Sequence, residues 1–232
     1  MQSLPNGYNA LILGASGALG AAFAEQLRAD PRCARLVTLG RSTTPAIDFD
    51  HPSSIAEAAQ AVQDRGPWHL IVVATGMLHG ATGGPEKRLA DLRAEHMLSS
   101  FNTNTIGPAL TLAHFAGQLA RTERSIFAVL SAKVGSIADN RLGGWYSYRA
   151  SKAALNMVIK TASIELARTH PNGVVAALHP GTVKSRLSAP FRGEQIGRPA
   201  SDSARELLQV LDGLTPADSG GFWAYDGGRL PW

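Results

Sequence analysis

Tyr148 and Lys152 stand four residues apart in the segment Tyr146-Ser-Tyr148-Arg-Ala-Ser-Lys152. Side chains at this spacing share one face of a helix, so the spacing predicts an ammonium beside a phenol. An adjacent ammonium lowers the pKa of a tyrosine from its free value of about 10, and reaching 7 requires roughly 4 kcal/mol. Such a phenol can protonate a carbonyl oxygen as a hydride arrives at carbon, and can take the proton back in reverse. On spacing alone, an exposed helical pair is the commoner arrangement.

A second pattern, Gly14-Ala-Ser-Gly17-Ala-Leu-Gly20, follows the apolar run Ala10–Leu13 and opens a helical pattern. Gly14 permits a tight turn, and the small residues that follow let a pyrophosphate approach the backbone and the positive end of the helix. Gly20 allows the helix to pack closely on the strand. A glycine turn directly after a first buried strand is typical of dinucleotide binding.

Arg41 follows the second apolar run, Leu36–Leu39, where the adenosine ribose is expected to lie. Sites selective for NAD place an acidic residue there to accept from the 2′-hydroxyl. No Asp or Glu lies within six residues of Arg41, and a guanidinium matches a 2′-phosphate instead. The sequence therefore favours NADP(H) over NAD(H), the alternative being that Arg41 is a solvated loop cation.

The elements that must position these residues alternate regularly along the chain. Short apolar runs typical of parallel strands buried on both faces are predicted at Ala10–Leu13, Leu36–Leu39, Leu70–Ala74, Ile126–Leu130, Val174–Leu178 and Phe222–Tyr225. Helices are predicted at Ala18–Ala29, Ser53–Asp64, Asn104–Arg121, Ser151–Arg168 and Ser201–Leu211. This rhythm predicts the α/β class, as one doubly wound Rossmann-like domain over residues 1–232 with a mostly parallel sheet flanked by helices.

Composition excludes several other classes of protein. With 44% hydrophobic and 17% charged residues the chain is not disordered, and one Cys excludes a disulfide framework or a multi-thiolate zinc site. The seven His are scattered, so no metal site is expected. The net charge is +4, but no basic run exceeds two residues and only 6% of residues are aromatic, which argues against nucleic-acid binding. No signal or membrane-spanning pattern is present, so a cytoplasmic location away from membranes is expected.

The sequence resembles the short-chain dehydrogenase/reductase family nearly end to end. The matching motifs, in the family's order and spacing, are Gly14-Ala-Ser-Gly-Ala-Leu-Gly20, Asn104-Thr-Ile-Gly107, Tyr148-Arg-Ala-Ser-Lys152 and Pro180-Gly-Thr-Val183. Within the family the chain is similar to the C-factor-like and sniffer-like carbonyl reductases. The phrases Gly135-Ser-Ile-Ala-Asp-Asn140, Gly143-Gly-Trp-Tyr-Ser-Tyr148 and Tyr225-Asp-Gly-Gly-Arg-Leu-Pro-Trp232 carry that likeness.

The resemblance implies roles for the matching residues. Tyr148 would donate the proton, Lys152 would lower the phenol pKa and hold the nicotinamide ribose, and Asn104 would support a water beside Lys152. The cofactor would also meet the glycine turn, the end of the second strand, and the turns after the strands at 70–74 and 174–178. Asp48 and Phe49 match a pair of an acidic and an apolar residue that meets the adenine in the family. The residues implied in these contacts are Gly14, Ser16, Gly17, Leu19, Arg41, Asp48, Phe49, Ala74, Thr75, Gly76, Pro180, Gly181, Val183 and Ser185.

Three positions depart from the family pattern. Ala18 stands where a Gly is frequent, and Val73-Ala-Thr-Gly76 replaces the family's Asn-Asn-Ala-Gly. Ala132 stands where the catalytic Ser usually lies, three residues before a Gly. Ser131 is slightly favoured as the replacement, although strand alternation could turn it away, and Ser136 is the alternative. If no Ser polarises the carbonyl, losing one such donor lowers the rate by about 10²–10³.

We therefore predict an oxidoreductase that transfers a hydride between NADP(H) and a small carbonyl or alcohol substrate, reduction with NADPH being favoured. The alternatives are a weakly catalytic dinucleotide-bound signalling or redox-sensing module, motivated by the departures, and a nucleoside-diphosphate-sugar epimerase. The epimerase is disfavoured because fewer than 50 residues follow Ser185. Residues 185–201 are predicted to form a lid, and the resemblance implies a homodimer or homotetramer built through the helices that carry Asn104 and Tyr148.

Overall fold

The sheet consists of six parallel strands in the order β2-β1-β3-β4-β5-β6. The computed structural model describes residues 1–80 and 83–232. The strands are β1 (Tyr8–Leu13), β2 (Cys33–Leu39), β3 (Leu70–Val73), β4 (Ser125–Leu130), β5 (Gly173–His179) and β6 (Gly221–Ala224). All six predicted strands are therefore confirmed, and five of them begin earlier than their apolar cores suggested. Residues of β3 and β4 are buried throughout, as a parallel sheet covered on both faces requires.

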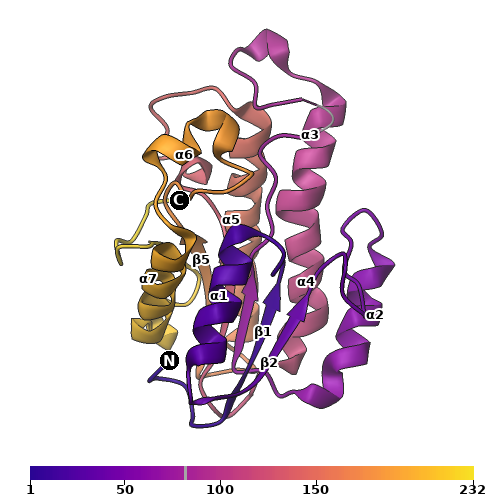
Figure 1. Ribbon diagram of the computed structural model, residues 1–232, viewed down its shortest axis with the longest axis vertical. Helices are drawn as coiled ribbons and strands as arrows, with labels where there is room; N and C mark the ends of the chain where they lie inside the picture. The colour runs from indigo at the N-terminus through magenta and orange to yellow at the C-terminus, as the bar shows by residue number, and fades with distance from the viewer. Residues whose placement is uncertain (81–82) are drawn as a thin grey trace.

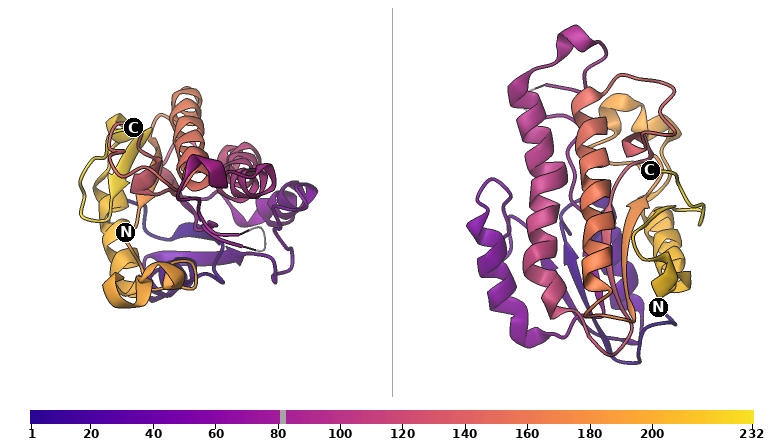
Figure 2. Two further views of the ribbon diagram at one scale, coloured as in Figure 1. Left: turned by 90° about the horizontal axis from the view of Figure 1, so that it is seen from above. Right: turned by 180° about the vertical axis from the view of Figure 1, so that it is seen from behind.

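Helices cover both faces of the sheet (Figures 1 and 2). One face carries α1 (Ala18–Ala29) and α7 (Ala200–Gly213), which pack side by side. The other face carries α2 (Ser53–Val62), α4 (Gly107–Phe115) and α5 (Tyr146–Leu166). Each layer has its own apolar core, so the doubly wound Rossmann-like class is confirmed. None of the described helices is both long and apolar enough to cross a bilayer.

Two helices begin earlier than predicted. The helix expected from Asn104 is preceded by α3 (Ala94–Phe101) and a π-helical turn (Asn102–Ile106), so Asn104 lies inside a continuous helical run. The helix expected from Ser151 begins at Tyr146, directly after a turn of three residues with positive φ, Gly143, Gly144 and Trp145. This early start places Tyr148 and Lys152 on the same helix.

The carboxyl ends of β1 and β3 mark the place where the chain leaves the sheet in two directions. β1 lies between β2 and β3, and Leu13 is in register with Leu39 on one side and Val73 on the other. Helix α1 leaves on one face and the segment after β3 continues toward the other, which creates a topological switch point. Ligands of open α/β sheets bind at such a point, outside the carboxyl ends of the strands.

The glycine turn between β1 and α1 depends on two backbone positions. Gly14 has a φ of +88°, a conformation that residues with a side chain rarely adopt. A Cβ at Gly20 would lie 2.2 Å from the Gly14 carbonyl oxygen and 2.7 Å from its carbon. The obstructing atoms are backbone, so they cannot move aside cheaply. Helix α1 can therefore begin this close to β1 only with Gly20.

We expect Gly20→Ala to lower the free energy of unfolding by about 1–3 kcal/mol, because the added methyl overpacks the turn against backbone atoms. Urea denaturation monitored by circular dichroism measures this loss. Gly117→Ala is the control, since a Cβ there has no heavy atom within 4 Å, and its stability should stay level or rise slightly. Equal stability of the two variants would contradict the close-packing role of Gly20.

Candidate functional site

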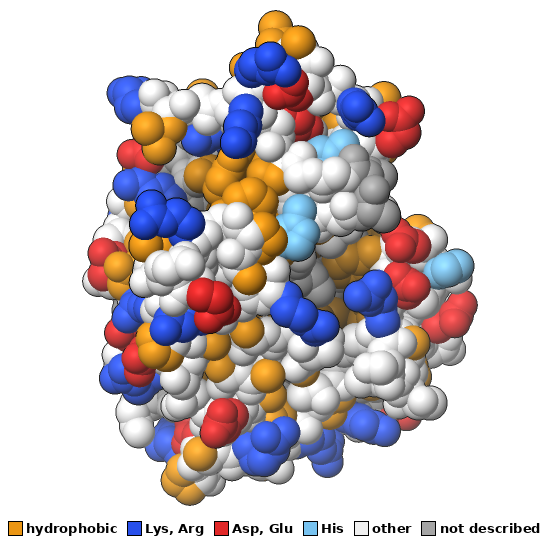
Figure 3. Space-filling model, turned by 45° about the horizontal axis from the view of Figure 1, so that its top comes forward, with side chains coloured by type: hydrophobic (Ala, Val, Ile, Leu, Met, Phe, Trp, Pro, Cys, Tyr) orange, Lys and Arg blue, Asp and Glu red, His pale blue; other side chains and the backbone are white. Residues whose placement is uncertain are grey.

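Two adjoining cavities open at the carboxyl end of the sheet, one of about 420 Å³ and one of about 370 Å³. Both are bordered by the glycine turn, the turn after β3 and the segment 185–201 that was predicted to form a lid, through the shared residues Gly17, Ala74, Thr75, Gly76 and Leu187. Figure 3 views this end of the molecule, where hydrophobic side chains line a hollow flanked by Lys and Arg side chains. The two cavities together form one elongated site.

The larger cavity gathers the residues expected at the adenosine and phosphate end. Its walls include Gly14, Ser16, Gly17, Arg41, Asp48, Phe49, Ala74, Thr75 and Gly76. Sequence reasoning did not include Asp50, Thr103 and Arg186, which line the same cavity. His79 also lines this cavity. The signal for Arg186 was its position directly after Ser185, and Asp50 and Thr103 left no sequence signal.

Acidic groups lie closer to Arg41 in space than the sequence suggested. Asp48 and Asp50 line the same cavity as Arg41. The Asp48 carboxylate accepts from the Asp50 N–H at 3.2 Å and lies 3.3 Å from His51 Nδ1. The Asp50 N–H holds the pKa of Asp48 below its usual value, with smaller contributions from His51 and Arg41 against the opposing effect of burial. Arg41 therefore lies on a wall of mixed charge.

The smaller cavity gathers the residues expected at the reacting end. Leu19, Ser131, Tyr148, Lys152, Pro180, Gly181, Val183 and Ser185 all line it. Leu78, Trp145 and Phe191 form an apolar wall of the same cavity. The Trp145 ring centroid lies 6.2 Å from that of Tyr148 and 5.4 Å from that of Phe191, and Leu78 packs against Tyr148.

Tyr148 and Lys152 are both buried in the wall of this cavity. Burial raises the pKa of Tyr148 to about 12 and lowers the pKa of Lys152 to about 7. The Lys152 Nζ donates to the Leu130 carbonyl oxygen at 2.9 Å. The predicted fall of the phenol pKa is therefore wrong in direction, because desolvation acts on both groups and the amine is bonded to the main chain.

Asn104 is completely buried and lines neither cavity. Its side chain accepts from the Met77 N–H at 2.8 Å and donates to the Met77 carbonyl at 2.8 Å and to Ser151 Oγ at 3.1 Å. A methyl on Gly76 would lie 3.7 Å from Asn104 Oδ1 and 3.9 Å from Lys152 Nζ. Asn104 therefore joins the turn after β3 to α5, close to the Lys152 amine.

The structure gives neither candidate serine a free hydroxyl toward Tyr148. Ser131 lines the smaller cavity, but its Oγ donates to Asn156 Oδ1 at 2.7 Å, so its proton is already engaged. Ser136 Oγ donates to the Trp232 carbonyl at 3.1 Å and lines neither cavity. Ala132, at the position where the family has its serine, belongs with Leu78 and Tyr148 to one buried apolar cluster. The geometry therefore favours the alternative in which no serine polarises the carbonyl.

The segment predicted as a lid, residues 185–201, contains two short helices and is closed at its base. A bridge joins Val183 to Arg198. The Arg198 guanidinium forms an ion pair with Glu206 at 2.6 Å and stacks over the Tyr225 ring at 4.0 Å. Arg198 thus fixes the end of residues 185–201 to α7 and to Tyr225, which follows β6. Other residues of the same stretch, such as Phe191, form one wall of the smaller cavity.

Two further polar residues line the smaller cavity without having been assigned to it. His179 Nδ1 accepts from the Lys133 N–H at 3.2 Å. Burial, together with the charge of Lys133, lowers the pKa of His179 to about 4. The imidazole is therefore neutral at pH 7 and carries its proton on Nε2.

The residues around the two cavities fit a dinucleotide. Gly14 and Gly20 bring the backbone of the turn and the start of α1 to the cavity wall, which suits a pyrophosphate. Thr75 Oγ1 is buried at the junction of the cavities and has no hydrogen-bond partner among the described residues, so a bound polar group could satisfy it. Among residues 1–80 and 83–232, no group of three or more His, Cys, Asp or Glu could hold a metal ion.

Comparison with curated proteins gives two relatives that this chain matches over more than four fifths of their own length. The chain is 37% identical over 145 residues to "C-signal" of Myxococcus xanthus, covering 62% of this chain and 83% of that protein. It is 32% identical over 200 residues to "1-hydroxy-2-glutathionyl-2-methyl-3-butene dehydrogenase" of Rhodococcus sp., covering 86% of this chain and 84% of that protein.

Comparison with solved structures finds the same fold. The carbonyl reductase Sniffer of D. melanogaster superposes with a TM-score of 0.84 at 23% identity, over 98% of this chain and 100% of that one. The NADPH-bound carbonyl reductase from chicken fatty liver gives a TM-score of 0.82 at 24% identity, over 98% and 95%. The family model for short chain dehydrogenases matches residues 40–195. By sequence and by fold, the chain belongs to the short-chain dehydrogenase/reductase family of oxidoreductases.

Proposed function

We propose that this protein is an NADPH-dependent carbonyl reductase in which Tyr148 donates a proton to the carbonyl oxygen of an aldehyde or ketone. One observation carries the proposal: Tyr148 and Lys152 are buried side chains in the wall of a cavity that continues directly into the glycine turn. A dinucleotide on the turn would present its reactive end beside the phenol.

Bound NADPH supplies a hydride, and the chain must supply a proton and a dry, oriented cavity. As negative charge develops on the carbonyl oxygen, the Tyr148 hydroxyl would protonate that oxygen, so that the product is the alcohol and a phenolate is left on Tyr148. Lys152, when charged, stabilises the phenolate that remains. Leu78, Trp145 and Phe191 exclude water and offer an apolar wall to the substrate.

The choice of NADPH rests on the larger cavity and on similar proteins. Arg41 is exposed on its wall, where a guanidinium can pair with a 2′-phosphate. The carbonyl reductase from chicken fatty liver binds NADPH, and a short-chain dehydrogenase/reductase from Burkholderia multivorans binds NADP. Asp48 and Asp50 reduce the positive charge of this wall. The preference for NADPH over NADH therefore depends on a direct contact between the Arg41 guanidinium and the 2′-phosphate.

A second candidate function is a dinucleotide-binding signalling module of weak activity. Ala132 offers no hydroxyl beside Tyr148, and Ser131 is bonded to Asn156. One relative, at 37% identity, is a protein called C-signal. In this alternative the cofactor binds tightly and the carbonyl is reduced slowly or not at all.

Assembly as a homodimer or homotetramer stays a prediction of the family resemblance. Exposed apolar side chains on α5 support a helical interface: Met157 and Ile164 are seven residues apart, so they share one face. Leu98 on α3 and Ile106 on the following π-helical turn are also exposed. Pairing of these helices in two copies would cover an apolar surface that otherwise faces water.

We expect Tyr148→Phe to lower kcat for carbonyl reduction by about 10²–10⁴, because the variant keeps the ring and loses the proton donor. The measurement is NADPH oxidation with a panel of aromatic and aliphatic aldehydes and ketones. Tyr146→Phe, two residues earlier on α5 and outside both cavities, should leave kcat unchanged. Tight NADPH binding by the unmodified protein without turnover of any carbonyl would support the signalling module instead.

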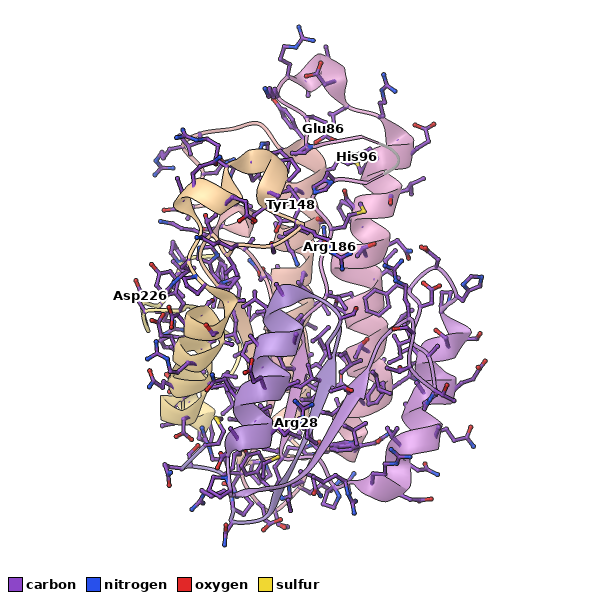
Figure 4. The ribbon with its side chains drawn as sticks, in the orientation of Figure 1. Arg28, Glu86, His96, Tyr148, Arg186 and Asp226 are labelled. Atoms are coloured by element: carbon purple, nitrogen blue, oxygen red, sulfur yellow. The ribbon has the colours of Figure 1, made fainter. Side chains whose placement is uncertain are left out.

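We expect Arg41→Asp to shift the preference between NADPH and NADH by at least about tenfold toward NADH, because the carboxylate repels a 2′-phosphate and accepts from a 2′-hydroxyl. The ratio of dissociation constants for the two cofactors measures the shift. Arg28→Asp, at the far end of α1 from the cavity (Figure 4), removes the same charge elsewhere and is the control. An unchanged ratio in Arg41→Asp would remove Arg41 from cofactor selection.

We expect the rate of carbonyl reduction at saturating NADPH to fall as the pH rises through about 7. Lys152 has its pKa lowered to about 7, so it is charged below that pH and can stabilise the phenolate only there. Tyr148, with a pKa of about 12, keeps its proton over the same range and cannot cause the fall. Lys152→Arg should move the fall to higher pH. A flat profile between pH 5.5 and 9 in the unmodified protein would contradict this role of Lys152.

A further inference from the structure

Glu86 is a buried carboxylate that lines neither cavity. One carboxylate oxygen accepts from the Ser147 N–H at 3.1 Å, and the other accepts from the Ser147 hydroxyl. The Glu86 carbonyl accepts from the Trp145 N–H at 2.5 Å. These bonds go to residues that immediately precede Tyr148, and Figure 4 shows Glu86 and Tyr148 at the same end of the molecule.

Helix α5 has no capping group of its own at its N-terminus. The first N–H groups of a helix lack partners within the helix and are usually satisfied by a side chain of the preceding residue. That residue is Trp145, which makes no such bond, and the first turn of α5 contains no acidic residue. The Glu86 carboxylate satisfies one of these N–H groups and places a negative charge at the positive end of the helix.

The backbone just before α5 also needs support. Trp145 has a φ of +53°, and Gly143 and Gly144 before it both have a φ of +63°. The left-handed conformation is unfavourable for a bulky residue and persists only where its surroundings hold it. The bond from the Trp145 N–H to the Glu86 carbonyl provides such a hold. Glu86 thus fixes both the residue before the helix and the second residue inside it.

The charge of Glu86 is stabilised locally. Burial alone would raise its pKa, but the bonds from Ser147, with a contribution from His96 of α3, hold the pKa below its usual value. His96 Nε2 lies 3.9 Å from the carboxylate. The pKa of Tyr148, by contrast, is raised by burial and by no neighbouring charge. Glu86 therefore acts on Tyr148 through the position of the helix and not through its charge.

We propose that Glu86 is a positioning residue, which anchors the first turn of α5 and thereby fixes the Tyr148 hydroxyl over the smaller cavity. The proposal rests on the function proposed above. Tyr148 follows Ser147 directly, so a loose first turn moves the phenol with it. A displacement of about 1 Å from the productive geometry can lower a rate by about 10²-fold.

The test compares Glu86→Ala and Glu86→Gln with Asp212→Ala. Asp212 is a matched control, because its carboxylate accepts from both the N–H and the hydroxyl of Ser3, at 2.8 and 2.6 Å. Ser3 is close to the N-terminus and Asp212 lies in the last turn of α7. Figure 1 shows the N-terminus and α7 together at the lower end of the molecule, away from the segment after β5 that borders the site. We expect Glu86→Ala to lower kcat at least about tenfold while the NADPH dissociation constant changes less than about twofold. Glu86→Gln should recover part of the loss, since its amide oxygen still accepts from Ser147. Asp212→Ala should lower the Tm with kcat unchanged.

Hydrogen exchange of the first turn of α5, read by mass spectrometry, tests the anchoring without requiring turnover. Exchange in the peptide covering residues 145–149 should accelerate in Glu86→Ala and stay unchanged in Asp212→Ala. Unchanged exchange in Glu86→Ala would overturn the anchoring role. Faster exchange with an unchanged kcat would overturn the link to the reaction. If the unmodified protein reduces no carbonyl with NADPH, the proposed function fails and the link to the reaction fails with it, while the exchange still reports on anchoring.

Discussion

The desolvation of an amine and a phenol within one crevice is the constraint on which the site depends. Lys152 and Tyr148 are both buried, and burial moves the pKa of each toward its neutral form. A buried amine must be hydrogen-bonded to be tolerated, and Lys152 is bonded to the carbonyl at the end of β4. The crevice therefore holds two groups that respond strongly to any charge brought beside them.

That constraint explains why a parallel sheet carries the site. The carboxyl ends of β1, β3, β4 and β5 meet at one edge, and the turns that follow them supply most of the cavity walls. Helix α5 lies against this sheet and brings Tyr148 and Lys152 to the same edge. Asn104, from a separate helical run, then ties the turn after β3 to α5. Groups from six segments meet with little freedom to move, as proton transfer to a small substrate requires.

Features that depend on residues close together in the sequence can be predicted from it. Features that depend on residues far apart in the sequence cannot. The strands and the Gly14 turn follow from local patterns, because buried parallel strands are continuous apolar runs and a positive φ selects glycine. The start of α5 does not, because Trp145 adopts a left-handed conformation that no local rule favours. Glu86 bonds to Ser147, which is 61 residues away in the chain, so local sequence patterns give no signal for it. The pKa of Tyr148 was wrong in direction because spacing shows a neighbouring charge and does not show burial.

For the carbonyl reduction proposed above, Ala132 sets the scale of catalysis that this crevice can reach. A missing hydrogen-bond donor to a developing oxyanion lowers a rate by about 10²–10³, whereas a positioned general acid contributes about 10²–10⁴. The two effects are of similar size, so a phenol without a partner hydroxyl still leaves net acceleration when it is well placed. Accurate placement of Tyr148 then matters more than in a site with two donors, because no second group holds the carbonyl oxygen. A buried carboxylate that fixes the first turn of its helix is a physically reasonable answer to that need.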